Sequence, residues 1–165
     1  MHLTKRVLQV IDTEGYRANV GIILVNATGS LFWARRIGED AWQFPQGGIR
    51  ESESAEQAVF RELQEEVGVT RDAVEMIGST RDWLRYDIPE HLIRRHQTPC
   101  CIGQKQRWFI LRFTGDESDV CLTNCEKPEF DQWRWVEQSE PPRSVISFKR
   151  SVYTEALKEL LPLIR

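Results

Sequence analysis

Apolar stretches divide the chain into strands and two amphipathic segments. Residues 18–25, ANVGIILV, are rich in β-branched side chains and predict a buried strand. The turn NATGS at 26–30 then leads to a hairpin partner at 31–36. The same pattern predicts further strands or extended segments at residues 73–86, 102–113, 120–122 and 130–136.

Two segments have the spacing of amphipathic helices. The first begins near Ser54, a suitable N-cap, and ends near Gly68, a suitable residue to follow a last helical turn. The second is marked by apolar residues at helical spacing, namely Val152, Ala156, Leu157, Leu160, Leu161 and Ile164. This order of elements predicts an α/β (α+β) fold, a mixed sheet with helices on both faces.

Length and composition fit one globular domain. The chain has 165 residues, 41% hydrophobic and 28% charged, and we assign residues 15–165 to the domain and 1–14 to an N-terminal extension. Residues 1–10 show no packing pattern, so deleting them is expected to leave activity and melting temperature almost unchanged. The net charge of −3 argues against a protein that coats nucleic acid, but it permits a local basic pocket.

The expected compartment is the cytoplasm. No apolar run is long enough to span a membrane, and the N-terminus lacks a secretory hydrophobic core. The cysteines form no CxxC pair, and His91 and His96 complete no usual zinc spacing. We therefore expect reduced thiols, and zinc binding is the minority interpretation. The four cysteines are Cys100, Cys101, Cys121 and Cys125.

Three carboxylates share one face of the first helix. Glu62, Glu65 and Glu66 lie at i, i+3 and i+4 near its C-terminal end, where the helix dipole and mutual repulsion both oppose negative charge. A solvated acidic face is the ordinary explanation. The adjacent Gly-Gly loop and Arg61 favour a metal site instead, because clustered hard oxygens suit Mg²⁺ or Mn²⁺. Arg61 can reach Glu62, and Glu53 could pair with Arg61.

Residues 47–69, GGIRESESAEQAVFRELQEEVGV, resemble the Nudix hydrolase box. Its fixed positions are all matched, by Gly47, Glu53, Arg61, Glu62, Leu63, Glu65, Glu66, Gly68 and Val69. Ser52 stands where relatives often have glycine, which could reshape the loop but removes no ligand.

The Nudix resemblance implies an α/β/α sandwich and a set of site residues. Glu62 would be the essential catalytic carboxylate, aided by Arg61 and Glu53. The expected ligands of Mg²⁺ or another divalent cation are the Gly47 carbonyl, Glu62, Glu65, Glu66 and Glu129. Whether Glu62 or Glu129 takes the proton from the attacking water stays open.

The resemblance extends to the RNA pyrophosphohydrolase branch of the family, also described as diadenosine polyphosphate hydrolases. The matching segments are GYR at 15–17, WQFPQGGI at 42–49, STR at 79–81, WLRY at 83–86, IGQKQ at 102–106, PEFD at 128–131 and SFKR at 147–150. This implies removal of pyrophosphate from the 5′ end of triphosphorylated RNA to leave a 5′ monophosphate, which initiates mRNA decay.

Such a substrate needs cations, hydrogen-bond donors and a surface for a base. Phe148, with Arg36 from the first hairpin, could sandwich a base of single-stranded RNA, although core packing is an equally good explanation of Phe148. The expected substrate-binding residues are Arg17, Arg36, Tyr86, Gln104, Gln106, Phe148 and Lys149.

Three other functions compete with this one. The same pocket could hydrolyse dinucleoside polyphosphates such as diadenosine tetraphosphate, or a deeper base pocket could serve oxidised nucleoside triphosphates. A non-catalytic nucleotide sensor ranks last, because such a protein usually lacks one motif carboxylate and all are present here.

Overall fold

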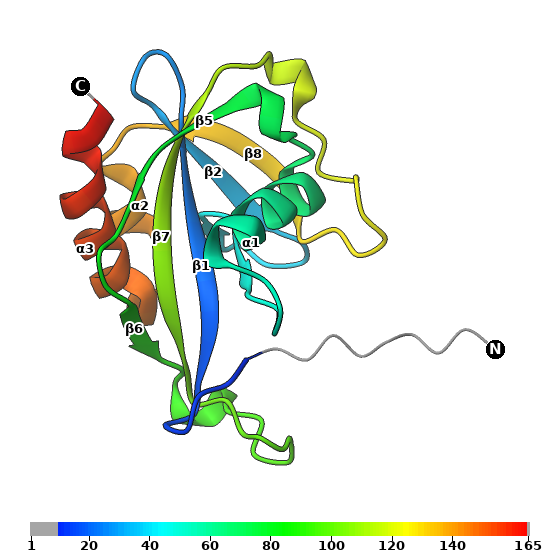
Figure 1. Ribbon diagram of the computed structural model, residues 1–165, viewed down its shortest axis with the longest axis vertical. Coiled ribbons are helices and arrows are strands. Elements are labelled where there is room, and N and C mark those ends of the chain that lie inside the picture. The colour runs from blue at the N-terminus through cyan, green and yellow to red at the C-terminus, as the bar shows by residue number, and fades with distance from the viewer. Residues whose placement is uncertain (1–9, 165) are drawn as a thin grey trace.

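The computed structural model describes residues 10–164 as a mixed sheet with helices on both faces (Figure 1). This confirms the predicted α+β sandwich. Residues 1–9, which form most of the segment predicted to be dispensable, lie outside the described residues, as does Arg165.

The described residues form an eight-stranded sheet whose central path runs β3-β2-β1-β7-β5. β4 pairs with β1, β6 with β7 and β8 with β2, and β1 and β7 run parallel while the other pairs described are antiparallel. The strands are β1 (Tyr16–Val25), β2 (Leu31–Arg36), β3 (Trp42–Gln43), β4 (Gln46–Gly48), β5 (Val74–Ser79), β6 (Leu84–Asp87), β7 (Gly103–Phe113) and β8 (Phe130–Val136).

The two strands of the first hairpin diverge directly after the turn. β1 and β2 are paired only at Val25 and Leu31, and β2 then continues with β8 and β3. The divergence leaves the edge of β1 free for β4, where Val20 pairs with Gly47 and Asn19 with Gly48. The glycine loop of the Nudix-like motif is therefore fixed against the middle of the sheet.

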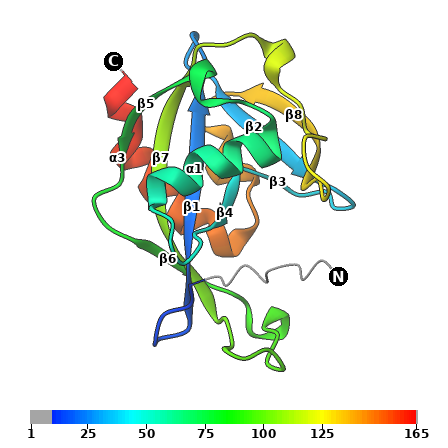
Figure 2. The same cartoon turned by 45° about the vertical axis from the view of Figure 1, so that its right-hand side comes forward.

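The helices cover the two faces of the sheet, with α1 on one face and α3 on the other (Figures 1 and 2). Alternate residues of β1 enter two cores: Val20 and Ile22 pack with α1, and Ile23 and Val25 pack with α3. The helices are α1 (Ala55–Glu62), continued by a π-helical turn at Leu63–Val67, α2 (Glu140–Ser144) and α3 (Arg150–Leu160).

The motif helix has the predicted ends but not a uniform pitch. The Ser54 hydroxyl accepts a bond from the Gln57 N–H at 3.1 Å, and the Gln57 side chain accepts one from the Ser54 N–H at 2.9 Å. Gly68 ends the helix at φ +76°, a conformation that favours glycine. Between them the backbone is α-helical only to Glu62 and then widens over Leu63–Val67.

Three details differ from the sequence pattern. Residues 120–122 were predicted as a strand but form irregular chain and a turn. The extended stretch at 73–86 is two strands, β5 and β6, separated at residues 80–83. The pattern also missed α2, because Pro141 and Pro142 argue against a helix at the sequence level. Proline is nevertheless tolerated in the first turn of a helix, where these two residues lie.

Residues 10–14 fold back onto the domain. The Val10 carbonyl accepts a bond from the Ala18 N–H at 2.8 Å, and Ile11 bridges to Arg17. The Asp12 carboxylate lies 3.1 Å from Lys105 Nζ. This part of the predicted extension is therefore bound to β1 and β7. Within residues 10–164, no helix combines the length and apolarity needed to cross a membrane.

Candidate active site

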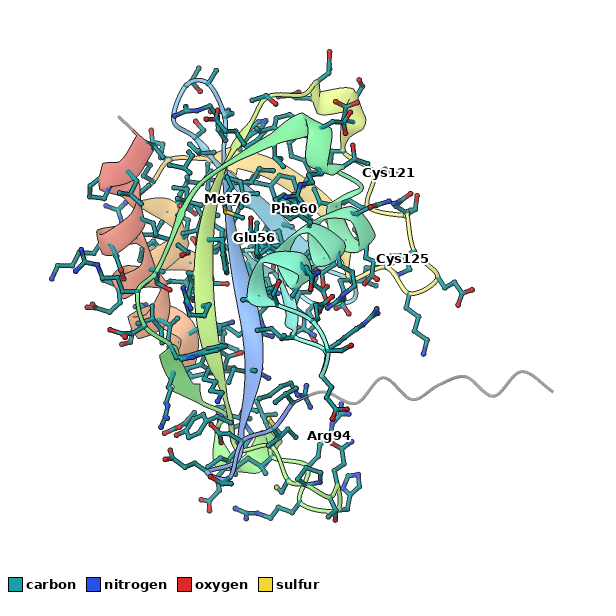
Figure 3. All side chains as sticks on the ribbon, viewed as in Figure 1. Glu56, Phe60, Met76, Arg94, Cys121 and Cys125 are labelled. Atoms are coloured by element: carbon teal, nitrogen blue, oxygen red, sulfur yellow. The ribbon has the colours of Figure 1, made fainter. Side chains whose placement is uncertain are left out.

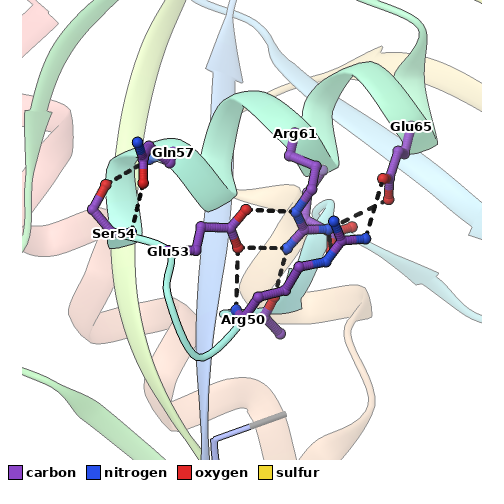
Figure 4. Close-up of polar contacts among 8 residues, drawn as sticks. Arg50, Glu53, Ser54, Gln57, Arg61 and Glu65 are labelled. Carbon is purple, nitrogen blue, oxygen red and sulfur yellow. Dashed lines mark hydrogen bonds and ion pairs between the residues drawn. The ribbon is translucent and has the colours of Figure 1, made fainter. Parts of the chain in front are cut away.

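Arg61 is the centre of an ion-pair network on α1 (Figure 4). Its Nε lies 2.7 Å from Glu53 Oε2, and its Nη2 lies 2.8 Å from Glu53 Oε1. Its Nη1 lies 2.7 Å from Glu62 Oε1 and 3.4 Å from Glu65 Oε2, while Nη2 also donates to the Gly48 carbonyl at 2.8 Å. The guanidinium therefore ties the motif loop to the carboxylate face of the helix, as the sequence spacing predicted.

Glu53 holds the other side of Arg61. Both of its carboxylate oxygens accept hydrogen bonds from the guanidinium, and Oε1 also accepts one from the Arg50 N–H at 3.1 Å. The hydrogen bond from Arg61 lowers the pKa of Glu53, so this carboxylate stays charged. A two-point contact of this kind fixes both position and orientation of the guanidinium.

Glu62 and Glu66 are buried carboxylates, each only 8% exposed. Burial raises the pKa of Glu62, and the hydrogen bond with Arg61 opposes that shift. Burial raises the pKa of Glu66 well above its usual range, and the charges of Glu62 and Glu129 raise it further. Glu66 Oε2 has no hydrogen-bond partner among residues 10–164. The described residues thus leave one oxygen of this buried carboxyl group without a partner.

The absence of a side chain at Gly47 leaves room for the Glu62 carboxylate. A Cβ atom at this position would lie 2.0 Å from Cδ of Glu62 and 2.3 Å from Oε1, far inside van der Waals contact. Pairing with β1 fixes the backbone at this point, so it cannot easily withdraw. Only a residue without a side chain allows the loop and the buried carboxylate to lie this close.

The donor set fits a divalent cation. It combines hard carboxylate oxygens, one of them buried and unpartnered, with a glycine backbone beside them. Among residues 10–164, no three ligand side chains already converge as a complete coordination set, and Arg61 holds Glu62 and Glu65 in ion pairs. Binding a cation there would therefore require Glu62 or Glu65 to share its oxygens with Arg61.

A cavity of about 390 Å³ lies over these carboxylates. Its anionic wall comes from α1, its π-helical continuation and the loop before β8, through Glu62, Glu65, Glu66 and Glu129. The same cavity is also lined by the cations Arg17, Arg36, Lys127 and Lys149. Its lining thus combines carboxylates suited to metal ions with cations suited to phosphate oxygens.

Comparison with known proteins identifies the family. The chain matches the NUDIX domain family over residues 15–156. The chain belongs to the Nudix family. A protein from Thioalkalivibrio sulfidiphilus named RNA pyrophosphohydrolase is 60% identical over 155 residues, covering 94% of this chain and 90% of that protein. A protein of the same name from Hahella chejuensis is 56% identical, covering 94% and 96%.

Solved structures agree with a Nudix fold. The E. coli dihydroneopterin triphosphate pyrophosphohydrolase superposes with a TM-score of 0.67 at 20% identity, covering 84% of this chain and 92% of that one. A C. elegans Ap4A hydrolase complex gives 0.64 at 16% identity, covering 88% and 97%. The family match and the curated relatives confirm the predicted family and the resemblance to its RNA pyrophosphohydrolase branch. Nudix enzymes in general use divalent cations, in keeping with the carboxylate wall.

Lys149 is the most deeply buried cation of the Nudix cavity. It is 6% exposed, and its Nζ donates to Gln43 Oε1 at 3.2 Å and lies 5.8 Å from the Tyr86 ring centre. Burial, with a smaller contribution from Arg36, lowers the pKa of Lys149 to about 8. The structure thus brings a cation with an unusually labile proton to the phosphate side of the site.

Four of the predicted substrate residues line the Nudix cavity, namely Arg17, Arg36, Gln104 and Lys149. The other three do not. Gln106 is fully buried, and its Nε2 donates to Asn19 Oδ1 at 2.8 Å. Tyr86 is 8% exposed, and burial raises its pKa to about 12. Phe148 is half-buried and packs against Tyr86 with ring centres 5.7 Å apart. These three side chains do not line the cavity, and Tyr86 and Phe148 pack in the core that contains α3.

The sequence pattern missed several residues that line the Nudix cavity. Gln46 is one of two hydrogen-bond partners of buried Gln106, at 3.4 Å, and Gln43 is the partner of Lys149. Cys125 lies on the loop beside the end of α1 (Figure 3). The full set is Asn19, Gln43, Gln46, Gly48, Cys125 and Lys127. None has a spacing signal of its own, although Gln43 and Gln46 fall within the segment WQFPQGGI.

Proposed function

We propose that this Nudix protein is an RNA pyrophosphohydrolase. It removes pyrophosphate from the 5′ end of triphosphorylated RNA, leaves a 5′ monophosphate, and thereby initiates mRNA decay in the cytoplasm. The observation that carries the proposal is the lining of one cavity of about 390 Å³, which combines the buried carboxylates Glu62 and Glu66 with the cations Arg17, Arg36 and Lys149. The names of relatives that are 56% and 60% identical support the same activity.

The reaction needs one water and one anhydride bond. An oxygen of water forms a bond to phosphorus, the bond to the bridging oxygen breaks, and pyrophosphate leaves with that oxygen. The cations Arg17, Arg36 and Lys149, which line the same cavity as the carboxylates, would hold the phosphate oxygens. Gln104, in the same wall, would add a neutral donor.

The carboxylate side would hold Mg²⁺ or Mn²⁺ through Glu62, Glu65, Glu66 and Glu129, with the Gly47 carbonyl as a further ligand. When bound, a divalent cation neutralises phosphate oxygens and lowers the pKa of a coordinated water. Glu66 would gain most from this charge, because one of its buried oxygens is unpartnered.

Glu62 would be the essential catalytic carboxylate. Arg61 positions it through the 2.7 Å contact, and Glu53 positions Arg61. The proton of the attacking water would pass to Glu62 or to Glu129, the exposed carboxylate on the loop before β8. Both carboxylates line the cavity, so both can reach a substrate bound there.

The deciding assay uses RNA with a 5′ triphosphate, incubated with and without Mg²⁺. We expect a 5′ monophosphorylated RNA and pyrophosphate in equal amounts, and no turnover with excess chelator. Diadenosine tetraphosphate and free nucleoside triphosphates serve as competing substrates in the same assay. A higher kcat/KM on either of them than on RNA would replace this proposal with the corresponding alternative.

A further inference from the structure

A second cavity of about 440 Å³ adjoins the catalytic one. The two share part of their walls, namely Arg17, Arg36, Gln104 and Glu129. The remaining wall comes from the loop at residues 88–102, through Ile88, Leu92, Arg94, Gln97 and Cys101. Nothing in the activity proposed above uses this loop, although a molecule bound at the carboxylates could extend directly into the second cavity.

The shared wall contains hydrogen-bonding groups without partners. Nε of Arg17 and Oε1 of Gln104 are both buried and make no hydrogen bond within residues 10–164. Gln104 is only 9% exposed. Buried polar atoms of this kind usually have partners, so this wall has capacity left for a polar ligand.

The charge of the second cavity favours phosphate. Arg17, Arg36 and Arg94 line it, against Glu129 as the one carboxylate among its lining residues. Arg94 is exposed, and within residues 10–164 its guanidinium has no carboxylate within ion-pair distance. It lies on the loop that extends beyond the end of the sheet (Figure 3).

The same loop supplies apolar surface beside the cation. Leu92 is 51% exposed, and Ile88, which packs on the α3 core, lines the same cavity. An apolar surface next to an arginine suits a nucleoside followed by a phosphate. RNA carries such a phosphate after its first nucleoside. The outer nucleoside of a dinucleoside polyphosphate does not.

We propose that the second cavity is a subsite for the RNA chain downstream of the 5′ end, in which Arg94 pairs with an internucleotide phosphate and Leu92 contacts the adjoining nucleoside. This inference rests on the proposed RNA pyrophosphohydrolase activity and deepens it. Through Arg94 and Leu92, the subsite gives the enzyme a means of preferring RNA over free nucleotides.

The chain provides a matched control at the next residue. Arg95 is also exposed and carries the same charge, but it pairs with Glu90 at 3.2 Å and does not line the cavity. Arg94→Ala and Arg95→Ala therefore remove equal charge from the same loop. The substrates are adenosine triphosphate, a 5′-triphosphorylated dinucleotide, a 5′-triphosphorylated tetranucleotide and diadenosine tetraphosphate.

Arg94→Ala should lower kcat/KM on the two oligonucleotides by about 3- to 10-fold, the scale of one exposed charged contact. It should leave adenosine triphosphate and diadenosine tetraphosphate unchanged, and Arg95→Ala should change none of the four. The slope of log kcat/KM against log salt on the tetranucleotide should become shallower by about 0.7 in Arg94→Ala, because one contact with a single strand is lost.

Equal values for Arg94→Ala and Arg95→Ala on the tetranucleotide would overturn the subsite. An equal loss on diadenosine tetraphosphate would assign the cavity to a second nucleoside, and it would also overturn the RNA-chain subsite. If wild-type protein hydrolyses no RNA, the proposed function fails. Fluorescence anisotropy with the same tetranucleotide then tests the subsite separately: weaker binding by Arg94→Ala alone supports it, and equal binding by all three proteins overturns it.

Discussion

The two charged sides of the catalytic cavity are held in different ways. On the carboxylate side, Arg61 makes contacts of 2.7–2.8 Å with Glu53, Glu62 and a loop carbonyl. On the cationic side, Lys149 contacts Gln43, and Nε of Arg17 has no hydrogen-bond partner within residues 10–164. Glu62, the proposed catalytic carboxylate, is therefore fixed by the protein, whereas Arg17, a proposed substrate-binding cation, keeps hydrogen-bonding capacity.

This difference predicts two kinds of effect when residues of the cavity are substituted. Changes on the carboxylate side should lower turnover of every substrate, because they alter the position or charge of the catalytic groups. Changes on the cationic side should act through capture of the substrate and should depend on which substrate is used. The four predictions below test this contrast, from the largest expected effect to the smallest.

Glu62→Gln should lower kcat on triphosphorylated RNA by about 10²- to 10⁴-fold, because it removes the charge of a positioned acid–base group while keeping its shape. Diadenosine tetraphosphate should show a similar loss if it is a substrate. The melting temperature should not fall, since Glu62 is a buried carboxylate with a raised pKa. Near-full RNA turnover by this variant would remove Glu62 from the catalytic role.

Gly47→Ala should lower kcat by about 10²-fold, the scale of a displacement of about 1 Å in a catalytic group. The added Cβ would otherwise lie 2.0 Å from Cδ of Glu62, so either the loop or the carboxylate must move. Gly48→Ala, at the next position in β4, is a comparison for the general effect of a methyl group in this loop. Unchanged kcat in Gly47→Ala would show that the close approach has no catalytic importance.

Phe148→Ala should lower kcat/KM on RNA by roughly 5- to 150-fold if the ring stacks on a base. Cleavage of a small polyphosphate that does not use the stack should fall much less. The ring also packs against Tyr86, so a melting curve must accompany the assay. Equal losses on both substrates with a lower melting temperature would make Phe148 a core residue, and the base clamp with Arg36 would be wrong.

The charge of Lys149 gives the smallest predicted effect. Burial lowers its pKa to about 8, so the side chain is charged below that pH and neutral above it. Attraction for phosphate should weaken as pH rises through 8, and kcat/KM on RNA should fall relative to Lys149→Arg, which stays charged. The ratio of the two proteins, measured from pH 6.5 to about 9.5, should change by about 3- to 10-fold. A constant ratio would contradict the role of this proton.

The local parts of this site could be predicted from sequence. Ser54, Gly68 and the Arg61 pairings depend on spacing within one helix and its loop, and spacing can be read directly from the chain. The strand at 18–25 could be predicted for the same reason, since a run of β-branched residues is a local signal. The Nudix-like motif then fixed the expected chemistry.

The non-local parts could not be predicted from these patterns. The sequence placed β2 beside β1, but nothing local indicates that the pairing stops at Val25 and Leu31 and that β4 takes its place. Burial of Lys149 and Gln106 also depends on packing between distant elements, and charged or amide side chains are usually expected at the surface. Gln43, Gln46 and Lys127 acquire a position in the site only when β3, β4 and the loop before β8 converge.

The parallel pairing of β1 with β7 has a consequence for how the protein is made. Asn19 and Gln106, which share a hydrogen bond in this pair, are 87 residues apart in sequence. Contacts of such long range form slowly, because a large loop must close before any pairing energy is gained. During translation, α1 leaves the ribosome after β1 and β4, which it contacts, but well before β7, which completes the same core. The core under α1 is therefore incomplete until residue 113 has emerged, and the cavity over the carboxylates is complete only after Lys149 follows.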